Sequence, residues 1–153
     1  MEFDAHQMID ALPGLVWVAT PDGRVEFLNR RWREYTGLDM NEAIDVGWQS
    51  AIHSDDLPAV LETWRAIVQS GRGGEVEGRL RRHDGVYRRF LLRAAPFLDA
   101  SGKIAKFYGI NTDIEDRLKA EEAVRAREHQ SDALLASETN LKLIIDRAPH
   151  RRR

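Results

Sequence analysis

The stretch EVEGRLRRHDGVYRRFLLRAAPFLDASGKIAKFYGINT, residues 75–112, decides the fold of this chain. Apolar and polar residues alternate along most of it, and alternation with a period of two is typical of β-strands that bury one face. The turn sequences His83-Asp84-Gly85 and Asp99-Ala100-Ser101-Gly102 interrupt the alternation and favour hairpins. We therefore predict three consecutive antiparallel strands, with the ranges 75–82, 87–96 and 104–112.

The apolar face of these strands forms the predicted core. Its residues are Val76, Gly78, Leu80, Phe90, Leu92, Ala94, Phe107, Gly109 and Asn111. The opposite face is rich in arginine, since residues 79–106 contain 8 basic and 2 acidic side chains in a chain of net charge −2. A basic segment can bind nucleic acid, but arginines that alternate with apolar residues indicate the solvent face of a sheet. We expect no nucleic-acid partner.

Two more strands and several helices precede this segment. Residues 15–20 and 25–28 form a predicted hairpin around the turn Pro21-Asp22-Gly23. Asn29 is the predicted N-cap of a helix over 30–36, because an Asn side chain accepts amide hydrogen bonds at a helix start. Other short helices are predicted over 2–11, 41–45 and 47–52.

A longer helix is predicted over 55–70. Ser54 or Asp55 is in place to cap it, and Pro58 falls in its first turn. Its apolar residues recur at spacings of three and four and form a stripe suited to a core. They are Leu57, Val60, Leu61, Trp64, Ile67 and Val68. The order of elements predicts an α+β fold: a five-stranded antiparallel sheet with helices inserted after the second strand, followed by a long C-terminal helix.

The C-terminal third of the chain has a helical pattern. We predict a helix over 114–146, with Asp113 as its N-cap, because no Gly or Pro interrupts residues 114–148. Leu134 and Leu141 occupy a positions of one heptad register, whereas polar residues weaken the middle of that register. The helix is therefore predicted to be a linker that dimerises weakly by itself.

A short internal repeat marks the end of this helix. Residues 8–13, MIDALP, and 144–149, IIDRAP, match in type at an offset of 136 residues. The first copy stands just before the first predicted strand, so the second indicates a truncated start of another such domain. The residues that follow, 149–153, are interpreted as a tail.

Composition excludes several classes of function. The chain has 153 residues, 42% of them apolar, and no Cys, which excludes disulfides and thiolate chemistry. No apolar run reaches the roughly 18–20 residues of a membrane span, and we expect a cytoplasmic location without direct membrane contact, with a membrane-anchored parent left open. His53 with Asp55 and Asp56 is better explained by helix capping than by metal binding, so no metal site is predicted. No phosphate loop or nucleophile elbow is present, and we expect no catalytic residues and no enzyme activity in this fragment.

Taken in order, these pieces resemble a PAS domain with a trailing PAC segment, the sensory-box type of bacterial multidomain sensor kinases. The residues that carry the resemblance are Leu12-Pro-Gly-Leu-Val-Trp17, Asp22-Gly23-Arg24, Phe27-Leu-Asn29, Trp32-Arg-Glu-Tyr-Thr-Gly37, Ile52-His53-Ser54-Asp55-Asp56, Asp84-Gly85, Pro96, Gly102 and Thr112-Asp113-Ile114. The resemblance covers about two-thirds of the chain and implies a sheet that cups helices around a small cavity. The expected organisation is an N-terminal cap helix over 1–11, the sensory domain over 12–114, a signalling helix over 115–148, and the tail.

The cavity implied by this resemblance would be lined by residues of the predicted core. They are Trp17, Leu80, Phe90, Leu92, Phe107 and Asn111. PAS relatives bind haem, flavins or small carboxylates, or bind nothing. Residues 55–70 contain no His for haem, and apolar residues stand where flavin binders have amides, so neither cofactor is expected. Plain core packing and a small hydrophobic ligand remain the two alternatives.

The resemblance implies signal relay rather than catalysis. Asp113 and Ile114 would pass a change in packing from the domain to the long helix and then to an output domain in the same chain. A sensor histidine kinase of a two-component phosphorelay is the predicted parent, with a diguanylate cyclase or phosphodiesterase as the alternative. A homodimer through the N-terminal and linker helices is expected, and a ligand-free dimerisation spacer is the competing function.

Overall fold

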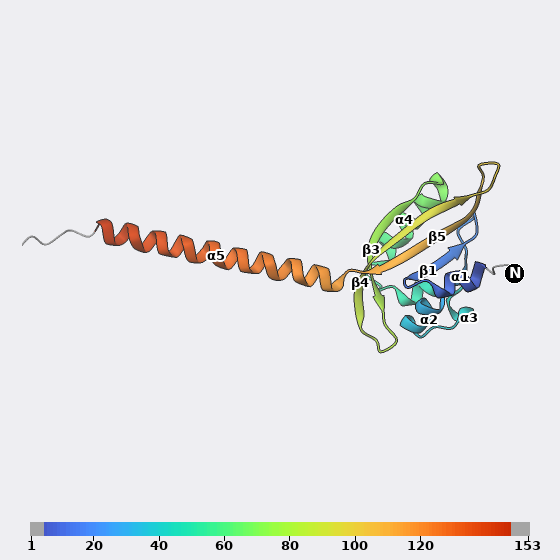
Figure 1. Ribbon diagram of the computed structural model, residues 1–153, viewed down its shortest axis with the longest axis horizontal. Helices are drawn as coiled ribbons and strands as arrows, with labels where there is room; N and C mark the ends of the chain where they lie inside the picture. Colours follow the sequence, from blue (N-terminus) through green and yellow to red (C-terminus); the bar gives the residue numbers. More distant parts are fainter. Residues whose placement is uncertain (1–4, 148–153) are drawn as a thin grey trace, which may run out of the picture. The chain divides into compact units, whose positions relative to one another are not determined.

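The computed structural model describes residues 5–147. The chain begins with a short helix, followed by two strands, a group of helices, three strands and one long helix (Figure 1). In order they are α1 (Ala5–Ala11), β1 (Leu15–Ala19), β2 (Val25–Leu28), α2 (Arg30–Thr36), α3 (Met40–Ala43), the 3-10 helix η1 (Gly47–Ala51), α4 (Leu57–Ser70), β3 (Gly74–Arg81), β4 (Tyr87–Leu98), β5 (Ile104–Asp113) and α5 (Glu115–Arg147). The predicted α+β class and its five strands are confirmed.

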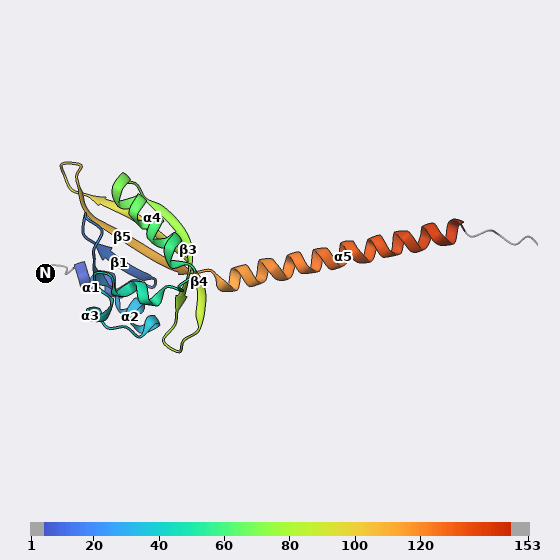
Figure 2. The same cartoon turned by 180° about the vertical axis from the view of Figure 1, so that it is seen from behind.

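The five strands form one antiparallel sheet in the order β2-β1-β5-β4-β3. The first and last strands of the sequence are therefore neighbours inside the sheet. The segment from α2 to α4 connects β2 at one edge with β3 at the other. Figure 2 shows α4 crossing the face of the sheet that is turned toward the viewer there.

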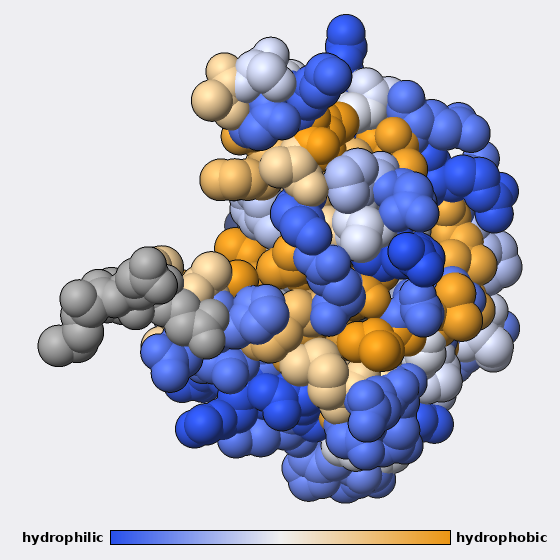
Figure 3. Space-filling model, turned by 90° about the vertical axis from the view of Figure 1, so that its right-hand side faces the viewer, coloured by the Kyte–Doolittle hydropathy of each residue, from blue (hydrophilic) through white to orange (hydrophobic). Residues whose placement is uncertain are grey.

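One face of the sheet carries most of the core. Leu80, Phe90 and Phe107 are at most 1% exposed, and they lie on β3, β4 and β5. Trp32 of α2 and Val60 of α4 pack into the same buried cluster. Apolar side chains also appear among polar ones on the surface (Figure 3).

Asn29 joins three elements at the start of α2. Its side-chain oxygen accepts the amides of Val16 and Trp32, each at 3.1 Å, so it both caps α2 and holds β1. Its amide group donates to the carbonyls of Ile9, at 3.1 Å, and Gly14, at 2.8 Å. Asn29 is fully buried, and this set of bonds satisfies its side chain on every side.

The start of α4 differs from the prediction. Its N-cap is Asp56 rather than Asp55, and no side chain caps the helix. The Asp56 carboxylate instead accepts the backbone amide of Arg79 at 2.7 Å. The carbonyl of His53 accepts the amides of Asp56 and of the first helical residue, and Pro58 has no amide hydrogen. The first turn therefore needs no side-chain cap.

A glycine on β5 makes room for an indole ring. A Cβ atom on Gly109 would lie 2.0 Å from Cζ2 of Trp17. The two residues are paired across β1 and β5. The ring of Trp17 therefore occupies the space that a side chain at this position would need, and only glycine leaves that space open.

The contacts of the chain divide it into two units, the first ending at Glu115 and the second beginning at Asp116. The helix α5 provides the second unit and keeps exposed apolar side chains such as Val124, Leu134 and Leu141. Within the described residues, no helix is both long enough and apolar enough to cross a membrane. The predicted tail over 149–153 and the end of the predicted repeat lie outside the described residues.

Candidate functional site

A small cavity lies between the inner face of the sheet and the helices. Its volume is about 60 Å³. That is several times the space one water needs and well below the roughly 150 Å³ of an apolar cavity known to hold benzene. Its lining residues are Trp17, Val25, Leu28, Trp32, Trp48, Ile52, Val60, Thr63, Trp64, Ile67, Val76, Leu80, Leu92, Arg93, Ala94 and Asn111.

The structure brings together only part of the predicted lining. Trp17, Leu80, Leu92 and Asn111 line the cavity, whereas Phe90 does not. Phe90 shares a face of β4 with Leu92, but it lies about 7 Å further along the strand at the usual rise per residue. There its ring packs edge-on against Tyr35, with centroids 5.1 Å apart.

Phe107 is the second predicted lining residue that does not reach the cavity. Its side chain is fully buried. Its ring meets Trp64 of α4 edge-on, with centroids 5.5 Å apart. Phe107 therefore contacts Trp64, which lines the cavity, and Phe107 itself is a residue of the core.

The helical side of the cavity was missed from the sequence. Val60, Thr63, Trp64 and Ile67 of α4 all line it. The apolar stripe at spacings of three and four identified three of these as core residues. No signal in the sequence separated the positions that face the cavity from those that fill the core.

Two tryptophans organise the polar contacts beside the cavity. The indole N–H of Trp17 donates to Oδ1 of Asn111 at 3.2 Å, which links β1 to β5. The indole N–H of Trp64 donates to the carbonyl of Gly23 at 3.1 Å. The two indole rings meet edge-on, with centroids 5.1 Å apart, so the strand side and the helix side of the cavity are in direct contact.

A second cluster lies where β5 ends and α5 begins. We call Arg88, Arg89, Asp113, Ile114 and Glu115 the exit cluster. Arg88 Nε donates to the Asp113 carboxylate at 2.6 Å, and the amide of Glu115 donates to the same carboxylate at 2.9 Å. The amide of Arg89 donates to the Glu115 carboxylate at 2.8 Å, and its carbonyl accepts the amide of Ile114 at 2.9 Å. Ile114 is 4% exposed, so the start of α5 is fastened to β4 by backbone and side chains together.

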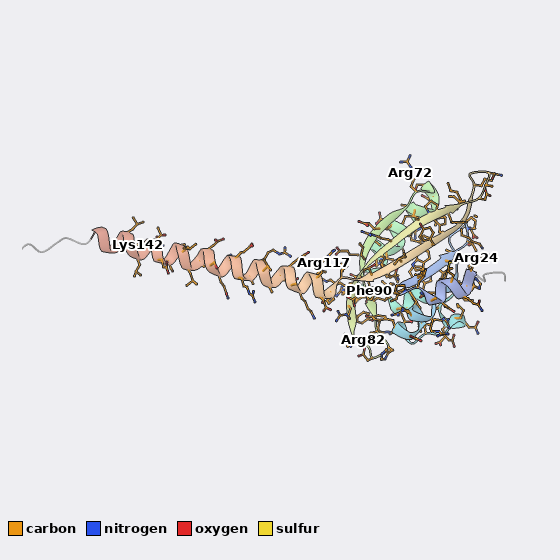
Figure 4. The ribbon with its side chains drawn as sticks, in the orientation of Figure 1. Arg24, Arg72, Arg82, Phe90, Arg117 and Lys142 are labelled. Atoms are coloured by element: carbon orange, nitrogen blue, oxygen red, sulfur yellow. The ribbon has the colours of Figure 1, made fainter. Side chains whose placement is uncertain are left out.

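Tyr35 borders the exit cluster. Its hydroxyl oxygen is fully buried and has no hydrogen-bond partner among the described residues. Burial, with a smaller contribution from the charge of Asp113, raises the pKa of Tyr35 to about 12. The phenol therefore stays neutral at physiological pH. Figure 4 labels two residues of this region, Phe90 on β4 and Arg82 just beyond β3.

The predicted cluster around His53 is explained by an ion pair. The guanidinium of Arg79 meets the Asp56 carboxylate through Nε at 2.8 Å and Nη2 at 3.0 Å. This hydrogen bonding holds the pKa of Asp56 below its ordinary value. Asp55 is exposed, and its amide donates to Nδ1 of His53 at 3.1 Å. Among the described residues, no three His, Asp or Glu side chains are placed to hold a metal ion together.

A family model described as the PAS fold matches residues 25–111. Among curated proteins, the peroxide stress-activated histidine kinase mak1 of Schizosaccharomyces pombe is 37% identical over 143 residues. The match covers 93% of this chain and 8% of mak1, so the chain corresponds to a small part of that protein.

Two solved structures have the same fold. A sensory box histidine kinase/response regulator from Burkholderia thailandensis aligns with a TM-score of 0.58 and 22% identity, over 85% of this chain and 99% of that one. A light-oxygen-voltage domain studied with a flavin analogue aligns with a TM-score of 0.59 and 18% identity, over 84% of this chain and 98% of that one.

The residues of the cavity do not fit a flavin. Its volume of about 60 Å³ is far below that of a three-ring cofactor. Leu80 is apolar, and the side-chain oxygen of Asn111 already accepts the indole N–H of Trp17. A polar group of a flavin next to Leu80 would have no partner there, at a cost of about 1–3 kcal/mol for each buried group. The chain also has no Cys to form a flavin adduct.

Proposed function

This chain belongs to the PAS family, and from that premise we propose that it is the sensory module of a multidomain bacterial histidine kinase in a two-component phosphorelay. A ligand or partner at the cavity changes the packing between sheet and helices. The change reaches α5 through Asp113 and Ile114, and α5 carries it to an output domain in the same chain. We further propose that the module works in the cytoplasm, because a chain without Cys suits a reducing compartment.

The observation that carries this proposal is the position of both sites on one strand. Asn111 lines the cavity, and Asp113 belongs to the exit cluster two residues later on β5. Their Cα atoms are therefore about 7 Å apart at the usual rise of a strand. A shift of β5 at the cavity reaches the first residues of α5 without an intermediate element.

The similarity to mak1 supports the choice of a histidine kinase as parent. The matched segment includes 93% of this chain and 8% of mak1. We propose that the catalytic part of the parent lies outside this segment. In the proposed organisation, residues 12–114 sense, residues 115–148 transmit, and catalysis belongs to other parts of the parent.

We propose that the module acts as a homodimer through α1 and α5. The support is the exposure of apolar side chains on both helices. Met8 of α1 is 52% exposed, and Leu134 and Leu141 of α5 are 65% and 63% exposed. Leu134 and Leu141 are seven residues apart, so they repeat on one side of the helix, as two protomers of a coiled coil require.

The relay is tested by the substitution Asp113→Ala in the full-length parent kinase. The expected result is a change of at least about twofold in basal or stimulated autophosphorylation, because the Arg88 pair and one contact of Glu115 are lost. Asp99→Ala is the matched control, since Asp99 lies in the turn between β4 and β5 and its hydrogen bonds to described residues all stay within that turn. Unchanged output in Asp113→Ala would contradict the relay.

A ligand-free dimerisation spacer is the second candidate function. The small volume of the cavity favours it, because about 60 Å³ holds only a few atoms. Native mass spectrometry of the freshly purified chain separates the two. A stoichiometric dimer with no added mass supports the spacer, whereas added mass in stoichiometric amount supports the sensor.

A further inference from the structure

The cavity is lined by a hydrogen-bond donor that no residue within 5–147 accepts from. An indole N–H can only donate, so the atom of Asn111 that faces Trp17 must be the carbonyl oxygen. The Nδ2 amide of Asn111 therefore points away from Trp17, and it makes no hydrogen bond with the described residues, although it is not one of their fully enclosed polar atoms. Asn111 is 6% exposed and lines the cavity, which is where an occupant can meet this amide.

A second donor beside the cavity is equally unused. Trp32 is 2% exposed and also lines the cavity. Its backbone amide is bonded to Asn29, but its indole N–H has no acceptor among the described residues. Neither nitrogen is fully enclosed, because the one fully buried side-chain atom without a partner among the described residues is the Tyr35 hydroxyl, so an occupant with an acceptor can replace water at these donors.

The charges around the cavity favour a neutral occupant. Its lining residues in the described part of the chain include no carboxylate, so no group there would pair with a cation. The one cation in the lining, Arg93, is exposed and already pairs with Glu75 at 2.9 Å. An anion would lose its hydration among mostly apolar walls without gaining a free positive charge.

We propose that the cavity binds a small neutral molecule whose carbonyl-type oxygen accepts a hydrogen bond from Nδ2 of Asn111 and whose apolar body contacts the surrounding side chains. This inference rests on the proposed function, in which the cavity is the sensing site. The volume of about 60 Å³ limits the molecule to a few non-hydrogen atoms unless the walls move.

The test compares two probes of the same shape, acetone and 2-methylpropene, which differ in a carbonyl oxygen against a methylene group. Each is titrated into the 153-residue chain and followed by the NMR signals of the side-chain amide of Asn111 and the indole N–H groups. Only acetone is expected to move the Asn111 amide protons downfield in a saturable way. The alkene leaves water more readily than acetone does, so the two dissociation constants differ even without a hydrogen bond in the cavity. We therefore compare the ratio of the acetone constant to the 2-methylpropene constant between the wild type and a variant.

Asn111→Asp at pH 8 removes the amide donor and keeps an acceptor for Trp17. The ratio of the acetone constant to the 2-methylpropene constant is expected to rise about three- to tenfold, the range of one net neutral hydrogen bond. Ala94→Leu fills the cavity from β4 and is the control, in which neither probe should bind.

The outcomes distinguish the ligand class from the sensing role of the cavity. Binding of both probes with an unchanged ratio and no downfield shift overturns the proposed ligand class, while the cavity remains a binding site. No saturable binding of either probe, or binding that survives in Ala94→Leu, overturns the inference together with the sensing role of the cavity. The shift in the wild-type chain decides the matter even if the Asp variant does not fold.

Discussion

Replacing Asn29 with Ala should cost a large part of the stability of this domain. The change removes the N-cap of α2, worth about 1 kcal/mol, and leaves the buried amide of Val16 without its side-chain acceptor, at about 1–3 kcal/mol. The carbonyls of Ile9 and Gly14 also lose a donor, but both residues are partly exposed and water can replace it. The expected loss is about 2–4 kcal/mol out of the roughly 5–15 kcal/mol typical of a domain.

Urea unfolding followed by tryptophan fluorescence measures this loss. With a slope of about 1–3 kcal/mol per molar urea, the midpoint should fall by about 2 M. Asn29→Asp keeps both accepting contacts and should lie between the wild type and Asn29→Ala. Asn41→Ala is the matched control, because Asn41 is an exposed residue of α3 and surface changes usually stay within about 0.5 kcal/mol. A midpoint for Asn29→Ala within about 0.5 M of the wild-type midpoint would refute the reasoning.

Three further predictions follow from single contacts. Gly109→Ala should destabilise the domain by about 3 kcal/mol or more, seen in the same urea assay, because the new methyl group would overlap the ring of Trp17. Asp56→Asn should lower Tm by about 5 °C at pH 7, because it weakens the contact with Arg79. Calorimetry at decreasing pH should show this difference in Tm shrink below pH 3.8, as the wild-type carboxylate becomes protonated too. Leu134→Glu should weaken the dimer several-fold in sedimentation without changing the unfolding of the domain, because its side chain is exposed.

For each of these three predictions, a control variant or a contradicting result can be named. Gly14→Ala should be tolerated, since a Cβ there meets Ile110 at an ordinary 3.4 Å. The sign of the Asp56 effect follows from its lowered pKa: the stability is present above the ordinary value and is lost as pH falls through the folded one. A constant difference between wild type and Asp56→Asn from pH 7 to pH 2.5 would contradict that argument. If Leu134→Glu left the proposed dimer unchanged, Leu134 would not be part of the interface.

The strands could be predicted from sequence because their signal is local. Alternation along residues 75–112 decides which side chains share a face, and the two Gly-containing turns decide where each strand ends. Pairing across the sheet is not local: β5 lies next to β1, and the ring of Trp17 over Gly109 is one contact between these strands, which are far apart in the sequence. Nothing in either residue alone signals that partner.

The lining of the cavity and the cap of α4 could not be predicted from local sequence patterns. Phe90 and Leu92 share a face of β4, but only Leu92 lines the cavity, because the position along the strand depends on which helix packs there. Asp55 and Asp56 are equally good caps by residue type. Asp56 occupies the cap position, and its carboxylate is used by Arg79, a residue of a strand formed later in the chain.

The interactions near the C-terminal end of β5 differ in strength, and the difference indicates where a signal can act. Strand β5 is hydrogen-bonded to β1 on one side and β4 on the other, so a ligand at Asn111 cannot break its register at an acceptable cost. The pair of Arg88 with Asp113 is different, because both side chains are partly exposed, at 20% and 34%, and such pairs contribute about 0.2–1 kcal/mol. Allosteric couplings are typically about 1–3 kcal/mol. On the proposed function, a coupling of this size is enough to release this pair while the sheet stays intact, and we therefore propose the exit cluster as the element that changes state.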